Sequence, residues 1–102
     1  MGYPQLCTLR EAVTEVPQGA FIVMAGTNDM APMALVRELV RQRKRGLRVI
    51  TAPTGGLNVD LLIGAGCLAS LELSAVSLGE FGAAPHFRRA AETRSLDLRD
   101  TT

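Results

Sequence analysis

The stretch that decides the fold lies at residues 21–40 and reads FIVMAGTNDMAPMALVRELV. It opens inside a continuous apolar run, residues 20–25, which is rich in strand formers and suits a strand buried on both faces of a parallel sheet. A polar loop with one glycine, residues 26–29, interrupts the run. Pro32 then falls in the first turn of an amphipathic helix that we expect to continue to Gly46. Strand, loop and helix in this order indicate an α/β domain.

The same pattern repeats along the chain at an even spacing. Strand-like runs are predicted at residues 20–25, 47–52, 71–78 and from 96 onward, with helices at 59–63 and 86–93 between the later ones. A capping box of Thr8 with Glu11 predicts one more short helix before the first strand. Right-handed βαβ crossovers are the economical way to connect such elements. We therefore predict one domain over residues 1–102: an open, three-layer, mostly parallel sheet with βαβ crossovers.

Composition excludes several classes of protein. The length of 102 residues suits a single core, and 47% apolar with 21% charged residues is typical of a globular domain rather than a disordered one. Lys and Arg number 11 against 10 Asp and Glu, and aromatic residues make up 4% of the chain. Because nucleic-acid binding requires a basic surface or a stacking platform, we expect no nucleic-acid partner.

The sequence also carries no signal for a membrane or a metal. No apolar run approaches the ~20 residues that cross a bilayer, and the first residues lack the pattern of a signal peptide, so we expect a cytoplasmic protein. Cys7 and Cys67 do not have the spacing of a metal site, and we expect two reduced thiols and no metal.

Any ligand site should lie at the carboxyl ends of the parallel strands, where the loops at residues 26–30, 54–58 and 79–82 share one edge. These loops offer small and hydrogen-bonding residues rather than a nucleophile with its base. Glu80 fits either a base or nucleophile in this crevice or a solvated loop residue. His86 is interpreted as a histidine at a helix start. Residues 64–69 match a relaxed dinucleotide pattern but follow a helix and precede a strand, so we reject that reading.

Several segments together resemble a known family. They are PMALV at residues 32–36, DLLIGAG at 60–66, GEFG at 79–82, Pro85, and FRRA at 87–90. In this order and spacing they are similar to the A-type subunit of glutaconate-type (family I) CoA-transferases, in register from about residue 8 to about residue 100. The resemblance implies the corresponding α/β fold for nearly the whole chain.

It also implies a function. Such enzymes move coenzyme A from an acyl-CoA to a carboxylic acid through a glutamyl thioester, and the glutamate belongs to the partner B-type subunit. No catalytic residue is therefore assigned to this chain, and Glu80 is not the nucleophile. Coenzyme A is a co-substrate, and no tightly bound cofactor is expected. The pocket loops are expected to contribute Gly26, Thr27, Asn28, Thr54, Gly55, Gly56, Gly79, Glu80 and Phe81.

Two departures from the family qualify this picture. Met30 and Ala31 precede Pro32 where the subtype carries a basic residue, which puts direct charge recognition of the acid by this loop in doubt. The resemblance also covers the leading part of an A-type subunit, so we expect a truncated sheet, inactive alone, with a sticky edge. Hydrolysis or ring opening of a CoA ester, or a non-catalytic interaction module built on this fold, are the alternatives.

Overall fold

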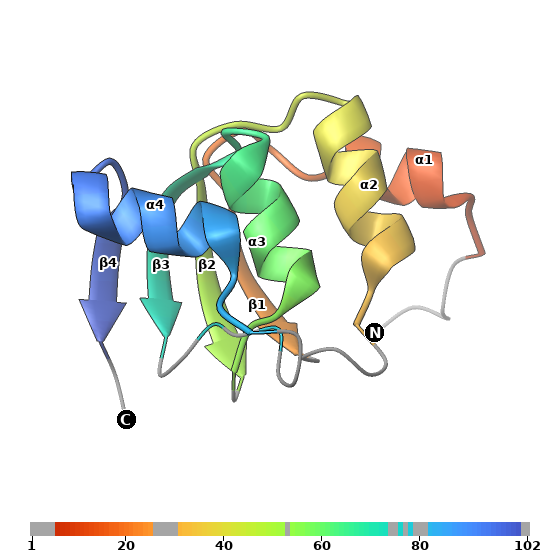
Figure 1. Cartoon of the computed structure of the whole chain (residues 1–102). Coiled ribbons are helices and arrows are strands. Elements are labelled where there is room, and N and C mark those ends of the chain that lie inside the picture. Colours follow the sequence, from red (N-terminus) through yellow and green to blue (C-terminus); the bar gives the residue numbers. More distant parts are fainter. Residues whose placement is uncertain are drawn as a thin grey trace.

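The computed structural model describes residues 6–25, 31–52, 54–73, 76, 78 and 82–100. Within them helices and strands alternate along the chain (Figure 1). In chain order they are α1 (Leu9–Thr14), β1 (Phe21–Ala25), α2 (Met33–Arg41), β2 (Leu47–Ala52), α3 (Leu57–Gly64), β3 (Leu68–Leu73), α4 (Pro85–Thr93) and β4 (Asp97–Asp100).

The strands form one sheet in the order β1-β2-β3-β4, and every neighbouring pair is parallel. The predicted α/β class with a parallel sheet is therefore confirmed. Because each crossover moves to the next strand in the same direction, connections of one hand leave their helices on the same face of the sheet. Figure 1 shows α2, α3 and α4 on that face. The described residues thus supply two of the three expected layers, the sheet and one layer of helices.

The core lies between the sheet and these helices. The alternation of side chains along a strand turns every second residue toward the helices, as with Leu47 and Val49 on β2 and Leu71 and Leu73 on β3. The helices contribute their apolar faces, and α1 adds Val13, which is fully buried. The largest buried aliphatic side chains of the helices are Val36, Leu39, Val59 and Leu62.

The first helix begins as predicted. The Thr8 hydroxyl accepts a hydrogen bond from the Glu11 backbone N–H at 3.1 Å, and the Glu11 carboxylate accepts one from the Thr8 backbone N–H at 3.4 Å. Strand β2 covers the six predicted residues, Leu47–Ala52. Helix α4 begins at Pro85, one residue before its predicted start, and α3 extends beyond the predicted 59–63 at both ends.

Two predicted boundaries are wrong. The third strand was expected at residues 71–78, but β3 (Leu68–Leu73) begins three residues earlier, because the backbone N–H of Leu47 bonds the Cys67 carbonyl at 2.9 Å and pairing with β2 starts at once. Residues 74, 75 and 77 of the predicted strand lie outside the described residues. The second helix was expected to end on Gly46, but α2 ends at Arg41. Arg43 takes the left-handed conformation there (φ 56°), and Gln18 stabilises the turn by donating to the Arg43 carbonyl at 3.2 Å.

Among the described residues, no helix is long and apolar enough to cross a membrane.

Candidate functional site

The carboxyl ends of all four strands point to one edge of the sheet (Figure 1). The loop after β2 and the segment after β3 meet there, because Gly55 forms a parallel bridge with Val76. Of the predicted pocket residues, Thr54, Gly55 and Gly56 lie at this edge, directly before α3. The others lie outside the described residues: Gly26, Thr27, Asn28, Gly79, Glu80 and Phe81.

Gly55 is packed too tightly for any side chain. A Cβ atom at this position would lie 2.9 Å from Cγ2 of Val59 and 3.0 Å from Cγ2 of Thr51. Such contacts are shorter than van der Waals packing permits, so the loop can pass this close to α3 only as glycine. The glycine thus lets the loop after β2 pack directly against β2 and α3.

The first turn of α3 adds backbone donors to this edge. Gly56 is the N-cap and has no side chain to bond the first helical N–H groups. Asn58, which is fully buried, instead accepts a hydrogen bond from the Gly56 backbone N–H at 3.1 Å. Because the first N–H groups of a helix lack intrahelical partners and carry partial positive charge, this turn favours a carboxylate, phosphate or thioester oxygen.

Thr51 brings a buried hydroxyl to the same place. Thr51 is the last inward-facing residue of β2 before the loop and is 7% exposed. Its Oγ1 atom has no hydrogen-bond partner among the described residues. A buried polar group without a partner costs about 1–3 kcal/mol, which a bound ligand or water would recover. Sequence reasoning missed Thr51, although a polar residue near the end of an otherwise apolar strand was the available signal.

Asp60 secures α3 to the next helix. Asp60 is 3% exposed, and its carboxylate accepts a hydrogen bond from the Phe87 backbone N–H at 2.8 Å. Just upstream, the Leu78 backbone N–H donates to the Gly82 carbonyl at 3.0 Å and shapes the approach to α4. The Asp60–Phe87 bond thus fixes the first turn of α4 against α3.

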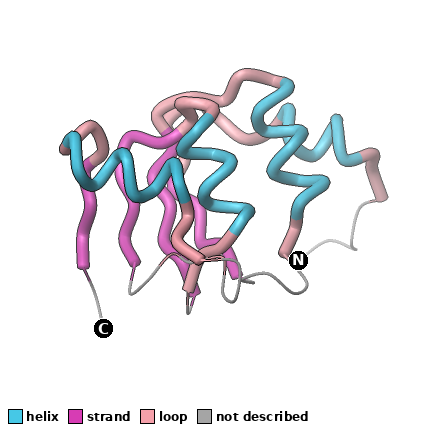
Figure 2. The backbone as a smooth tube through the Cα atoms, in the orientation of Figure 1, coloured by secondary structure: helices cyan, strands magenta, loops and turns pink. Residues whose placement is uncertain are grey.

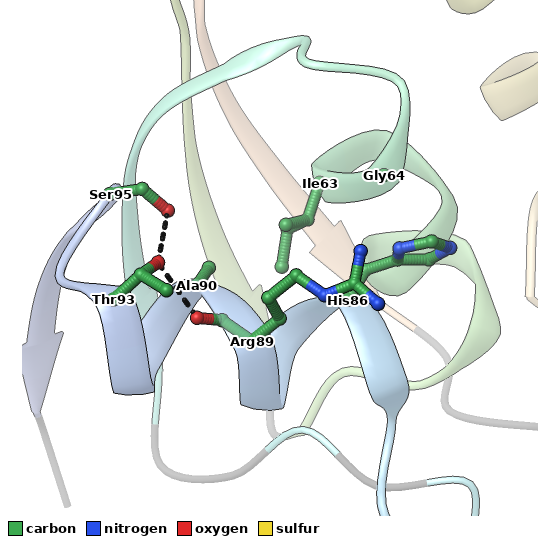
Figure 3. Close-up of a pocket in the computed structure, with 7 residues that line it drawn as sticks. All are labelled: Ile63, Gly64, His86, Arg89, Ala90, Thr93 and Ser95. Atoms are coloured by element: carbon green, nitrogen blue, oxygen red, sulfur yellow. Dashed lines mark hydrogen bonds between the residues drawn. The ribbon is translucent and has the colours of Figure 1, made fainter.

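A separate cavity of about 210 Å³ lies between α3 and α4 (Figure 3). The His86 ring packs directly on the backbone of Gly64, where an added Cβ would lie 2.7 Å from the ring Cδ2. Figure 3 shows the Arg89 side chain extending along the cavity toward His86. The lining residues are Ile63, Gly64, His86, Arg89, Ala90, Thr93 and Ser95. None belongs to the predicted pocket loops, so this cavity is distinct from the carboxyl edge.

His86 itself is exposed in the first turn of α4, the place expected of a histidine at a helix start. Among the residues whose structure is described, no three His, Cys, Asp or Glu side chains come together in a way that could hold a metal ion. Both thiols, Cys7 and Cys67, are free. In this part of the chain the carboxyl edge offers ligand contacts and no nucleophile with its base.

The described residues therefore form an α/β domain with a parallel sheet, whose carboxyl edge carries a close-packed glycine loop and the N-terminus of α3. The family model for coenzyme A transferase matches residues 7–100, and the chain belongs to that family. The resemblance seen in the sequence is therefore confirmed.

Individual relatives agree with this assignment. The A-type subunit of 3-oxoadipate CoA-transferase from Pseudomonas knackmussii is 41% identical over 71 residues, which cover 69% of this chain and 25% of that protein. The solved structure of the decarboxylase AibA/AibB superposes with a TM-score of 0.86 at 35% identity, covering 94% of this chain and 38% of the other. Glutaconate coenzyme A-transferase from Acidaminococcus fermentans superposes with a TM-score of 0.87 at 26% identity, covering 94% and 31%. This chain thus spans well under half the length of each.

Proposed function

We propose that this chain forms the leading part of a CoA-transferase A-type subunit, which moves coenzyme A between an acyl-CoA and a carboxylic acid. The observation that carries the proposal is the match of the coenzyme A transferase model to residues 7–100, together with 41% identity to the A-type subunit of a 3-oxoadipate CoA-transferase. Coenzyme A is then a co-substrate, and the chain needs no tightly bound cofactor. The proposed compartment of the protein is the cytoplasm.

The catalytic glutamate is proposed to come from a B-type partner subunit. Its carboxylate attacks the thioester carbon, and the CoA thiolate leaves, forming a mixed anhydride. The thiolate then attacks the glutamyl carbon, which releases the first acid and leaves an enzyme thioester. The second acid takes up coenzyme A by the reverse sequence. The described residues of this chain fit a supporting role, because their carboxyl edge presents backbone N–H groups and the Thr51 hydroxyl rather than a nucleophile.

The edge would act by placing the acyl or carboxylate oxygens. Gly55 lets the loop pack against Val59 and Thr51 and so positions the first turn of α3, which would complement negative charge that develops on a thioester oxygen. Thr54 and the predicted residues of the other two loops, Gly26 to Asn28 and Gly79 to Phe81, would complete this wall of the pocket.

The test is co-expression with a B-type subunit, followed by co-purification and an assay of CoA exchange between an acyl-CoA and a free acid. We expect a stable complex that exchanges CoA, and neither chain should do so alone. In that complex Thr51→Val, which keeps the shape of the side chain, should lower kcat/KM, whereas Thr93→Val, at the C-terminal end of α4 and away from the carboxyl edge, should not. If the complex forms but transfers no CoA from the acyl-CoA to the free acid, the chain would instead be a non-catalytic interaction module.

One observation favours a second candidate reaction. The AibA/AibB decarboxylase is 35% identical to this chain, against 26% for glutaconate CoA-transferase, at nearly equal TM-scores. Since fold and family do not determine the reaction, a lyase acting on a CoA ester is the alternative. Release of carbon dioxide without transfer of CoA would establish the lyase reaction. Release of free coenzyme A without its transfer to the second acid would indicate hydrolysis of the thioester.

A further inference from the structure

A second cavity adjoins the one between α3 and α4. Figure 2 shows both helices on the same side of the strands. The cavity beside His86 and Arg89 measures about 210 Å³. The second measures about 190 Å³ and is lined by Ile63, Gly66, Leu68, Ala90, Ser95 and Leu96. Because Ile63, Ala90 and Ser95 line both cavities, the two are adjacent parts of one groove, which we call the α3–α4 groove.

One end of the groove is cationic. The Arg89 side chain extends along the first cavity toward the His86 ring (Figure 3). Within the described part of the chain, neither of these side chains forms a hydrogen bond or an ion pair. The Arg89 guanidinium therefore has its N–H donors available, in the planar fork that fits a carboxylate or a phosphate. The residues that line the groove include no Asp or Glu, so the lining itself holds no charge that would repel an anion.

The hydroxyl groups of the groove are already bonded. The Thr93 hydroxyl donates to the Arg89 backbone carbonyl at 2.8 Å and lies 3.1 Å from the Ser95 Oγ atom. Both hydroxyls lie at the C-terminal end of α4, where the unpaired carbonyls of a helix carry partial negative charge. An anion is therefore favoured beside Arg89 and His86 rather than beside the hydroxyls.

The other end of the groove is apolar. Ala90 is buried and Ile63 is half-buried where the two cavities adjoin. Leu68 and Leu96, both half-buried, line the second cavity beyond them. A methylene group that is buried completely among such side chains raises affinity by up to about fourfold. This end of the groove therefore favours a hydrocarbon chain.

The size and the two ends of the groove together indicate one class of ligand. Each cavity is smaller than the ~300 Å³ at which pockets for drug-sized ligands begin. A bare anion would leave the apolar end unused, and a neutral hydrocarbon would leave the Arg89 guanidinium without a partner. A small ligand that uses both ends has an anionic head and a short aliphatic chain. A carboxylate suits the head, because its two oxygens match the guanidinium fork.

We propose that the α3–α4 groove binds a short aliphatic carboxylate, whose oxygens accept hydrogen bonds from Arg89 and His86 and whose chain lies against Ile63 and Ala90. The groove lies between two helices, and none of its lining residues belongs to the carboxyl edge. The binding site is therefore additional to the proposed function.

The probe is hexanoate, titrated into the isotope-labelled wild-type chain and followed by the amide shifts in its NMR spectrum. We expect saturable shifts centred on the residues of the groove. Arg89→Gln should raise the Kd at least about threefold, as the loss of an exposed ion pair allows. Arg88→Gln removes the same charge from the neighbouring position of α4, which lines neither cavity, and should leave the Kd unchanged. Circular dichroism should confirm that each variant folds.

A series of ligands tests the two ends of the groove separately. Affinity should rise from acetate through butanoate to hexanoate, because each longer chain buries more apolar surface. Hexanol has the same chain without the charge and should bind at least about threefold more weakly than hexanoate. Ile63→Ala removes part of the apolar wall and should weaken hexanoate while leaving acetate unchanged.

Several outcomes would overturn the proposal. Equal effects of Arg89→Gln and Arg88→Gln would mean that the general charge of α4 attracts the acid. Inorganic phosphate that binds as tightly as hexanoate, with no gain along the acid series, would leave an anion site without a place for a chain. Shifts centred on Thr54 to Gly56, or no saturable shifts, would remove the groove as the binding site. None of these results depends on CoA exchange, so the proposed function stands or fails separately.

Discussion

The Asp60 carboxylate on α3 caps α4 by accepting the Phe87 backbone N–H at 2.8 Å. Ala84 holds the N-cap position of α4 and has no side-chain acceptor, so the acceptor comes from a neighbouring helix 27 residues away. A helix cap within one element is a local feature. Here the cap is tertiary, and it joins two consecutive crossovers of the sheet.

Removing this acceptor should destabilise the fold. Asp60→Ala leaves a part-buried N–H without a partner, and we expect a loss of about 1–2 kcal/mol in the free energy of unfolding. Asp60→Asn retains an acceptor oxygen and should lose less. Asp97→Ala removes an exposed carboxylate and should change stability little. Urea unfolding measures all three, and equal losses for Asp60→Ala and Asp97→Ala would contradict the capping role.

The packing of Gly55 predicts a contrast between two glycines. Gly55→Ala places a Cβ against Val59 and Thr51 in the closely packed edge and should cost about 1–3 kcal/mol. Gly64→Ala meets the His86 ring, which is exposed and can rotate away, while alanine improves helix propensity. Its effect should stay within about 1 kcal/mol. Unfolding midpoints in urea compare the pair, and a larger loss at Gly64 would refute the steric argument.

Glu38 predicts a pH dependence of stability. Gln42 donates to this carboxylate at 2.9 Å, and that hydrogen bond, with the Arg41 charge, lowers the pKa of Glu38 below its ordinary 4.5 despite burial. A lowered folded-state pKa contributes stability that is complete above 4.5 and is lost as the pH falls through the folded-state value. Wild type should therefore lose more stability than Glu38→Gln between about pH 6 and about pH 3.5.

The control for this experiment is Glu92→Gln, which removes an exposed carboxylate paired with Arg88 at 3.1 Å. It should keep the acid sensitivity of the wild type, because an exposed ion pair contributes little. If Glu38→Gln were as acid-sensitive as the wild type, another group would be responsible for the dependence.

The two thiols should differ in reactivity. Burial raises the pKa of Cys67 above 9.0, partly offset by the Arg45 charge, whereas Cys7 is exposed. Since the thiolate is the reactive form, Cys67 should remain unmodified by a thiol reagent at about pH 8 in the folded chain. Mass spectrometry should find one label per folded chain, on Cys7, and two after denaturation. Labelling of Cys67 at the rate of Cys7 would contradict its burial.

Local signals in the sequence were sufficient for several elements. The capping box of Thr8 and Glu11 forms as predicted because its two hydrogen bonds join residues three positions apart. Strand β2 has its predicted bounds, because Gly46 precedes its run of strand-forming residues and the loop that contains Thr54 follows it. The segments at residues 32–36, 60–66, 79–82 and 87–90, taken together with Pro85 in their order and spacing, indicated the family that the comparison confirms.

Other features depended on contacts between distant residues. The start of β3 at Leu68 was set by pairing with β2, and no local pattern marks it. The Thr51 hydroxyl is identified as an orphan by what surrounds it in space, and the clash that requires Gly55 involves Val59 on the following helix. The roles proposed for Thr54, Gly55 and Gly56 remain predictions.

By itself, then, the sequence determined the α/β class, the parallel crossovers and the family, because periodicity, capping and chain punctuation act over a few residues. The tertiary structure alone decided that α2, α3 and α4 share one face, that Asp60 caps α4, and that Phe21 and Val23 are left exposed. The physical reason is that strand order and burial are properties of the packed chain, in which the environment of a residue is made by segments far away in sequence.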